Sequence, residues 1–167
     1  PAAIPAWKIA PALAFGNAVV IKPAELAPAS AWSIAEIISR SSLPKGIFNL
    51  IMGKGSVVGN AIVNHADVAG VSFTGSVEVG RTLAATLAKR LARVQLEMGG
   101  KNPLVVLDDA DLNGAVNSAV NGAFFSTGQR CTASSRLIVT EGIHDRFVQA
   151  IIERMSKLKV DDALAPG

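Results

Sequence analysis

The sequence predicts an α/β fold whose strands form a parallel sheet. Short apolar runs rich in valine and isoleucine alternate along the chain with longer segments in which apolar residues recur at helical spacing. Such alternation is typical of strand–helix units with right-handed crossovers. Glycine-rich and polar stretches follow the predicted strands, and ligands bind parallel sheets at the carboxyl ends of the strands. The candidate functional residues are therefore expected at one edge of the sheet.

The first unit follows a predicted helix over residues 4–15, in which Pro11 is expected to cause a kink. The uncharged run 17–21 and the lysine after it predict a strand buried on both faces, as strands of parallel sheets are. A second helix opens at Pro28. Its inward face is predicted to carry Ala31, Ile34, Ala35 and Ile38.

The second and third units contain predicted strands at 47–51 and 70–73. Between them, the segment Gly53–Gly59 differs by one residue from the glycine spacing of the dinucleotide fingerprint, and a helix then runs to about His65. The alternative interpretation of these glycines is a tight strand-to-helix turn.

Ser76 is the predicted N-cap of a helix over residues 77–90. Its free N–H groups could alternatively bind an anion, because helix N-termini attract negative charge. Residues 93–97 are predicted to form the fourth strand. The carboxyl edge of the sheet would then hold Lys22, Glu25, Gly55, Ser76 and Glu97.

The pattern changes after Gly99, where a strand at 103–107 has no helix before it. A helix from Leu112, a strand at 136–140 and a helix over 143–159 follow. The residues expected to face inward are Leu112, Ala115, Val116, Ala119, Val120 and Ala123 on the first helix and Phe147, Ile151 and Met155 on the second.

Three aspartates, Asp108, Asp109 and Asp111, lie close together before the first of these helices. They could suggest a metal site, but no His or Glu accompanies them. A polar turn and helix start is the better interpretation, and no metal is expected.

Composition excludes several functions. The 16 Lys and Arg exceed the 13 Asp and Glu by only three, the basic residues are dispersed, and nucleic-acid binding is not expected. The uncharged stretches 9–21 and 112–129 are interrupted by proline, glycine or asparagine, so neither predicts a membrane span. A lone cysteine cannot form an internal disulfide, which suits a reducing compartment such as the cytoplasm.

That cysteine, Cys131, follows the polar stretch Ser126–Arg130, which predicts a loop that presents the sulfur. The thiolate is the reactive form of cysteine, and a neighbouring positive charge lowers the thiol pKa. The alternative is a buried structural thiol, since free cysteines are often buried. A thiol-hydrolase pair with His144 is a further alternative, although no orienting Asn or Asp motif accompanies it.

Glu97 is the candidate partner of the thiol. It ends an apolar strand and is followed by two glycines, which let the backbone turn sharply. Desolvation at the end of a buried strand would raise the carboxyl pKa, as a general base requires. An ordinary charge at a strand end is the alternative.

Five ordered motifs resemble those of the aldehyde dehydrogenase superfamily. They are Pro-Ala-Trp-Lys-Ile-Ala-Pro-Ala-Leu (5–13), Val-Ile-Lys-Pro-Ala-Glu (20–25), Phe-Thr-Gly-Ser (73–76), Leu-Glu-Met-Gly-Gly-Lys (96–101) and Gly-Gln-Arg-Cys-Thr-Ala (128–133). The resemblance implies an internal segment of a longer chain, with the later part of a Rossmann-like cofactor-binding domain over 1–99 and the beginning of the α/β catalytic domain over 100–167. The segment alone is expected to be inactive.

The same resemblance implies that Cys131 attacks the aldehyde carbon and that Glu97 activates the water that hydrolyses the resulting thioester. The Cys131 N–H would supply part of the oxyanion hole, and Lys8 matches a lysine near the active site. The cofactor would be NAD, with NADP as the alternative. Its implied contacts are Lys22, Glu25, Gly55, Gly59, Phe73, Thr74, Gly75, Ser76, Met98 and Gly99.

Within that family, residues 125–137 are most similar to the 2,5-dioxopentanoate (alpha-ketoglutarate semialdehyde) dehydrogenases, with succinate-semialdehyde dehydrogenases as close alternatives. A semialdehyde acid is therefore the expected substrate, and Arg130 and Arg136 could contact its distal carboxylate. Alternatively, both arginines hold the loop through backbone carbonyls or surface carboxylates. An alternative function is that of a relative that binds the cofactor but does not catalyse a reaction. The resemblance also implies a homodimer or homotetramer.

Overall fold

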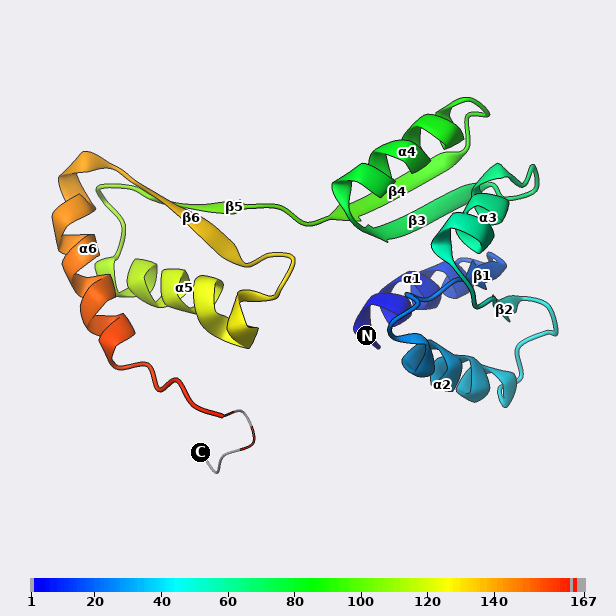
Figure 1. Ribbon diagram of the computed structural model, residues 1–167, viewed down its shortest axis with the longest axis horizontal. Helices are drawn as coiled ribbons and strands as arrows, with labels where there is room; N and C mark the ends of the chain where they lie inside the picture. Colours follow the sequence, from blue (N-terminus) through cyan, green and yellow to red (C-terminus); the bar gives the residue numbers. More distant parts are fainter. Residues whose placement is uncertain (1, 163, 165–167) are drawn as a thin grey trace. The chain divides into compact units, whose positions relative to one another are not determined.

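The computed structural model describes residues 2–162 and 164, and it divides the chain into two compact units, one up to Met98 and one from Gly99 (Figure 1). Each unit is an α/β arrangement with parallel strands, as the sequence predicts. Within the described residues, no helix is both long enough and apolar enough to cross a bilayer.

The first unit alternates strands and helices. Strand β1 pairs with β2, and β3 pairs with β4, each pair in parallel register. Helix α4 packs on both β3 and β4, while α1 contacts β1 and α2 contacts β2. The elements are α1 (Ala3–Ala14), β1 (Val19–Ile21), α2 (Pro28–Ser39), β2 (Phe48–Leu50), the π-helical turn η1 (Gly55–Gly59), α3 (Asn60–Asn64), β3 (Gly70–Gly75), α4 (Val77–Ala88) and β4 (Arg93–Met98).

Local chemistry explains where α4 begins and how it packs. The Ser76 hydroxyl accepts a hydrogen bond from the N–H of Val79 over 3.3 Å, so it caps the helix as predicted. Gly80 faces β4, and a Cβ at this position would overlap the sulfur of Met98 and touch Leu96. Leu96 and Met98 therefore point towards α4. Because side chains alternate along a strand, Gln95 and Glu97 point to the opposite face.

Burial of the strands differs from the prediction. Among the described residues, the four strands of this unit form two separate two-stranded ladders and not one continuous sheet. Val20 is 46% exposed and Val94 is 41% exposed, so the expectation of burial on both faces is wrong for β1, and β4 is not the buried strand that the prediction for Glu97 assumed. The physical reason is incomplete coverage. Both strands of a two-stranded ladder are edge strands, and the described helices cover only part of each ladder.

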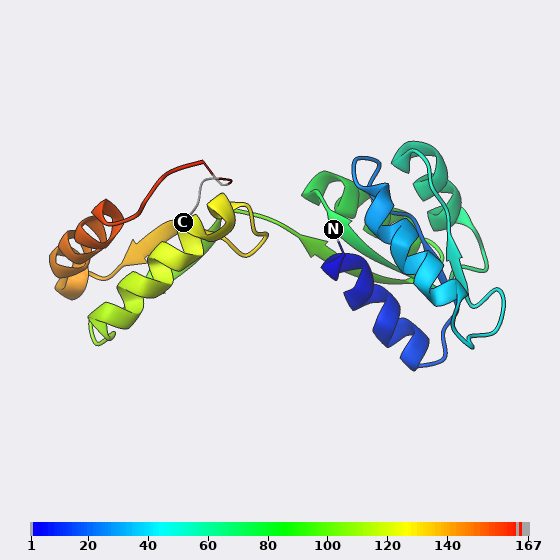
Figure 2. The ribbon, with the colours of Figure 1, turned by 90° about the horizontal axis from the view of Figure 1, so that it is seen from below.

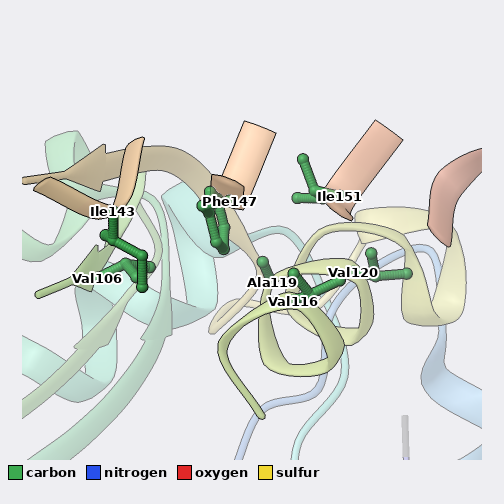
Figure 3. Packing of buried hydrophobic residues seen from close by; sticks show 7 residues of the cluster. All are labelled: Val106, Val116, Ala119, Val120, Ile143, Phe147 and Ile151. Atoms are coloured by element: carbon green, nitrogen blue, oxygen red, sulfur yellow. The ribbon is translucent and has the colours of Figure 1, made fainter. Parts of the chain in front are cut away.

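The second unit packs two helices on one parallel strand pair. Helix α5 contacts both β6 and α6, and the three elements enclose a core with the strand β5 (Figures 2 and 3). The elements are β5 (Asn102–Val106), α5 (Leu112–Phe124), the 3₁₀ turn η2 (Phe125–Gly128), β6 (Ser134–Val139) and α6 (Glu141–Ser156). The buried core residues are Val106, Val116, Ala119, Val120, Ile143, Phe147 and Ile151.

Met155 departs from the prediction for the last helix, because it is 40% exposed and not part of that core. It lies one turn beyond Ile151, in the last turn of α6. The other predicted inward residues of α6, Phe147 and Ile151, are buried.

The aspartate cluster serves the helix starts. Asp111 caps α5, its carboxylate accepting from the N–H of Gly114 over 2.9 Å. Asp108 accepts from the N–H of Ile143 over 3.1 Å and from the hydroxyl of Thr140, which ties the end of β5 to the start of α6. Within the described part of the chain, no group of three or more His, Cys, Asp or Glu residues could hold a metal ion.

Candidate active site

The carboxyl ends of β1 and β2 bring together three of the predicted cofactor residues. The Lys22 ammonium donates to the carbonyls of Pro23 (2.6 Å) and Gly53 (3.1 Å), so it joins the segments that leave the two strands. The Glu25 carboxylate accepts from the N–H of Gly55 over 2.6 Å. These contacts border a hollow of about 280 Å³ lined by Pro23, Ala24, Glu25, Pro28, Met52, Gly53 and Lys54.

The predicted residues at the end of β3 form a tight strand-to-helix turn. A Cβ on Gly75 would overlap the far end of the Phe73 ring, so a larger residue there would require that ring to move. Ser76 follows as the N-cap of α4, and Thr74 is exposed beside it. Gly59 is the last residue of η1, where a backbone approach is unobstructed by described atoms. Met98 packs towards α4, and Gly99 begins the second unit.

Glu97 lies on β4 in a line of polar side chains that starts at Lys8 on α1. The Lys8 ammonium donates to the Ser72 hydroxyl over 2.6 Å, and that hydroxyl donates to Gln95 Oε1 over 2.7 Å. Gln95 Nε2 in turn donates to Glu97 Oε1 over 3.3 Å. Partial burial lowers the pKa of the Lys8 ammonium, and the charge of Glu97 opposes that shift.

Glu97 itself is exposed in the first unit, so the predicted strand end is not a buried one. Leu96, the apolar neighbour that precedes Glu97 in the predicted strand, faces α4 on the other side of the ladder, as does Met98. The described neighbours of Glu97 are the polar side chains of the Lys8 line.

Cys131 is exposed on the loop between η2 and β6, as the loop interpretation predicts. Asn102 holds this loop from the first residue of β5: its side-chain amide donates to the carbonyls of Cys131 (2.7 Å) and Ala133 (3.1 Å). The β5–β6 register shifts at the same place, between Asn102 and Pro103. Proline cannot donate a ladder hydrogen bond, and bulges of this kind occur beside functional sites.

The turn before Cys131 has an unusual backbone. Ser126 (φ 53°), Thr127 (φ 55°) and Gly128 (φ 69°) are all in the left-handed region. This conformation is costly for residues with a Cβ, particularly a β-branched one such as threonine. At Gly128 a Cβ would also lie 2.7 Å from the carbonyl oxygen of Ala123, so glycine is required there on two grounds.

The two arginines on either side of Cys131 both contact backbone carbonyls. The Arg130 guanidinium donates to the carbonyl of Asn121 over 2.6 Å and lies 4.9 Å from the centre of the Phe125 ring. Arg136 Nε donates to the carbonyl of Lys101 over 3.0 Å. Of the two interpretations, the structure favours contacts with backbone carbonyls: Arg130 ties the Cys131 loop to the end of α5, and Arg136 ties β6 to the residue before β5.

The two histidines lie on the surface. His144 is exposed near the start of α6 and contacts Asp145 over 2.9 Å, and His65 is exposed at the end of α3. The described side-chain partner of His144 is therefore Asp145, the next residue in the sequence. This arrangement does not support a thiol-hydrolase pair.

Three polar residues at the site were not expected from the sequence. Ser72 contacts Lys8 on α1, 64 positions away, and Gln95 on β4, 23 positions away. In the second unit, Asn102 contacts carbonyls 29 and 31 positions away. A signal was present for Ser72 and Gln95. Polar side chains on alternate positions of a strand indicate a face that is turned away from the apolar core.

Comparisons with known proteins agree with these features. The model of the aldehyde dehydrogenase family matches residues 1–167. An alpha-ketoglutaric semialdehyde dehydrogenase of Bacillus subtilis is 48% identical over 164 residues, which are 98% of this chain and 34% of that protein. The chain thus spans about a third of the length of such relatives.

Solved structures are similar as well. An NADP-dependent enzyme of E. coli has a TM-score of 0.89 and 43% identity, over 99% of this chain and 34% of that one. A betaine aldehyde dehydrogenase of Staphylococcus aureus in complex with NAD⁺ has a TM-score of 0.84 and 44% identity, over 93% of this chain and 31% of that one.

Proposed function

The chain belongs to the aldehyde dehydrogenase family, and from this premise we propose that it is the cofactor- and thiol-bearing part of an enzyme that oxidises an aldehyde to a carboxylic acid. The observation that carries the proposal is the exposed thiol of Cys131 on a loop that Asn102 holds by two hydrogen bonds. Residues 1–99 belong in this proposal to the cofactor-binding domain and residues 100–167 to the catalytic domain.

Cys131 is the proposed nucleophile. Its thiolate attacks the aldehyde carbon, a C–S bond forms, and the carbonyl oxygen becomes the oxyanion of a thiohemiacetal. The backbone N–H of Cys131, the residue that also carries the nucleophile, donates a hydrogen bond to that oxygen. Donors of this type stabilise such oxyanions strongly, and removing one costs roughly 10²–10³ in rate.

Glu97 is the proposed general base for the second half of the reaction. Loss of hydride from the thiohemiacetal leaves a thioester on Cys131. Glu97 takes a proton from water, the oxygen of that water attacks the thioester carbon, and the C–S bond breaks. The carboxylic acid and the free Cys131 thiolate are the products of this step.

NAD is the proposed cofactor, and when bound it supplies the hydride acceptor. The hollow at the ends of β1 and β2 fits part of a nucleotide, because it combines apolar walls with the Glu25 carboxylate. Gly55 occupies one carboxylate oxygen of Glu25 and leaves the other for a ribose hydroxyl. Lys22 uses two donors on carbonyls, and an ammonium has a third.

A carboxylate beside the ribose accepts hydrogen bonds from its hydroxyls and repels a 2′-phosphate. We therefore expect a higher kcat/KM with NAD than with NADP, and Glu25→Gln should narrow the difference by removing the repulsion. Lys22 moderates the preference through its positive charge. A clear preference for NADP in the unmodified enzyme would mean that Glu25 does not face the ribose.

The proposed substrate is a semialdehyde acid such as 2,5-dioxopentanoate, with succinate semialdehyde as the alternative. The similarity to the Bacillus protein supports the class. The carbonyl contacts of Arg130 and Arg136 leave recognition of the distal carboxylate to other groups. Equal kcat/KM for 2,5-dioxopentanoate and an uncharged aldehyde of similar length would contradict this substrate.

The decisive experiment separates the two catalytic roles in the whole enzyme. Cys131→Ala should abolish acylation and hydride transfer together, whereas Glu97→Gln should keep a rapid burst of cofactor reduction and then turn over slowly. Turnover within about tenfold of the original in Cys131→Ala, which is about 1.4 kcal/mol of barrier, would overturn the assignment. Thiol-dependent hydrolysis of an activated ester distinguishes the enzyme from a non-catalytic cofactor-binding relative.

A further inference from the structure

The first unit contains an unbroken line of hydrogen bonds from an ammonium to a carboxylate. It starts at Lys8 on α1, crosses β3 at Ser72 and reaches Gln95 and Glu97 on β4. Ser72 is paired with Gln95 in the parallel ladder, and Gln95 and Glu97 are two residues apart, so all three lie on one face. The opposite face, with Leu96 and Met98, belongs to α4.

The chemistry at the two ends decides the direction of every bond in between. An ammonium can only donate, so the Ser72 oxygen accepts from Lys8 and sends its own proton onward. An ionised carboxylate can only accept, so the amide nitrogen of Gln95 faces Glu97 and its carbonyl oxygen faces Ser72. A glutamine satisfies both neighbours at once, whereas a glutamate at 95 would place a second carboxylate against Glu97.

We propose that Ser72 and Gln95 are positioning residues that hold Glu97 Oε1, so that Oε2 is the oxygen presented to the water that hydrolyses the thioester. The proposal rests on the proposed role of Glu97 as general base. Without the amide of Gln95, the exposed Glu97 side chain is free to change rotamer. Rotational freedom of this kind lowers the fraction of enzyme in which the base is aimed correctly.

A change in Gln95 should therefore slow one step only. Gln95→Met keeps the length of the side chain and removes both hydrogen bonds. We expect the acyl-enzyme to decay roughly 10-fold more slowly. Losses of this size are found when a residue that orients a metal ligand by a hydrogen bond is replaced. The rate and amplitude of the cofactor-reduction burst should stay unchanged, because acylation does not use Glu97. Gln149→Met, the same change on an exposed residue of α6, should leave both steps unchanged.

Ser72 provides a test of the line itself. Ser72→Ala removes the hydroxyl that joins Lys8 to Gln95, and we expect acyl-enzyme decay to slow by about threefold, because Gln95 still reaches Glu97 directly. Ser72→Thr keeps a hydroxyl on the same Cβ and should restore the original decay rate. A merely structural role for Ser72 would not distinguish the two variants by this measurement.

The experiment uses the whole enzyme, in which the acylated form is followed by rapid quenching and mass spectrometry. The double variant Glu97→Gln with Gln95→Met should decay no more slowly than Glu97→Gln alone, because Gln95 acts through Glu97. Additive effects, a slowed burst, or normal decay in Gln95→Met would overturn the proposal while Glu97 keeps its role. Normal decay in Glu97→Gln alone would instead overturn the base assignment, and this proposal with it.

Discussion

The carboxylate and the thiol are supported in opposite ways. Glu97 lies on a regular strand, and its described hydrogen-bond partner is the side chain of Gln95, two residues before it on the same face of that strand. Cys131 lies on a loop whose described contacts go from side chains to backbone carbonyls, through Asn102 and Arg130. A strand already determines where its side chains point, whereas a loop needs its backbone held before any side chain has a defined position.

This difference predicts where a substitution acts. Changes around Glu97 should alter the aim of one side chain and little else. Changes around Cys131 should move the backbone, and hence both the sulfur and the N–H that is proposed to hold the oxyanion.

Gly128→Ala should have the largest effect. The new methyl would meet the carbonyl of Ala123 in a left-handed turn, so the backbone before Cys131 must shift. We expect the rate of the cofactor-reduction burst to fall by roughly 10² or more, since small misplacements of a nucleophile have effects of this size. Stopped-flow measurement of the burst checks the result.

Gly16→Ala is the matched control for that substitution. Gly16 is also left-handed, at φ 78°, but a Cβ there would meet no described atom within 4 Å. It should lower the free energy of unfolding by about 1 kcal/mol through the backbone conformation alone and leave the burst unchanged. Equal effects of the two substitutions on the burst would contradict the special role of the Cys131 loop.

Asn102→Leu should have the next largest effect. It keeps the approximate size of the side chain but leaves the carbonyls of Cys131 and Ala133 without their donor. We expect a roughly 10-fold slower burst and a loss of about 1–3 kcal/mol in the free energy of unfolding. Acyl-enzyme decay, which depends on Glu97, should change less. A variant that slows decay more than the burst would contradict this account.

The contrast also explains how far the sequence predicted the structure. Alternating apolar runs and the N-caps Ser76 and Asp111 depend on neighbours within a few residues, so the helices and strands were predicted to within a few residues of their observed bounds. Exposure of Val20 was not, because burial depends on which other elements cover a strand. The family motifs include Glu97 and Cys131.

The contacts of Asn102, Ser72 and Gln95 depend on strand register between segments far apart in the sequence. Local patterns carry no register of this kind, so these partners could not be named in advance. The same holds for Arg130, since a charged residue beside a cysteine looks identical in sequence whether it faces the substrate or a carbonyl.

The arginines should have a smaller and unselective effect. Arg136→Leu removes a donor from the carbonyl of Lys101, so we expect kcat/KM to fall by about 3- to 10-fold through the backbone next to Asn102, as for the loss of one hydrogen bond of ordinary strength. Because the contact is with the backbone, the loss should be equal for 2,5-dioxopentanoate and for an uncharged aldehyde. A selective loss for the acidic substrate would assign Arg136 to substrate recognition.

The smallest expected effect concerns the charge of Glu97 as felt by Lys8. Burial lowers the pKa of Lys8 and the Glu97 carboxylate opposes that shift, so Glu97→Gln should lower this pKa further. Below the ordinary lysine pKa, a lower value means a larger fraction of neutral amine, and the neutral amine is the form that an acylating reagent attacks. Lys8 should therefore be acetylated faster in Glu97→Gln at pH 8–9.5, by less than about fivefold, since partly solvated pairs are worth at most about 1 kcal/mol. Peptide mass spectrometry after brief acetylation measures this, with exposed Lys45 as the internal reference. Slower or unchanged labelling of Lys8 relative to Lys45 would mean that the charge of Glu97 does not affect the pKa of Lys8. The hydrogen bonds between Lys8 and Glu97 would then transmit no measurable electrostatic effect.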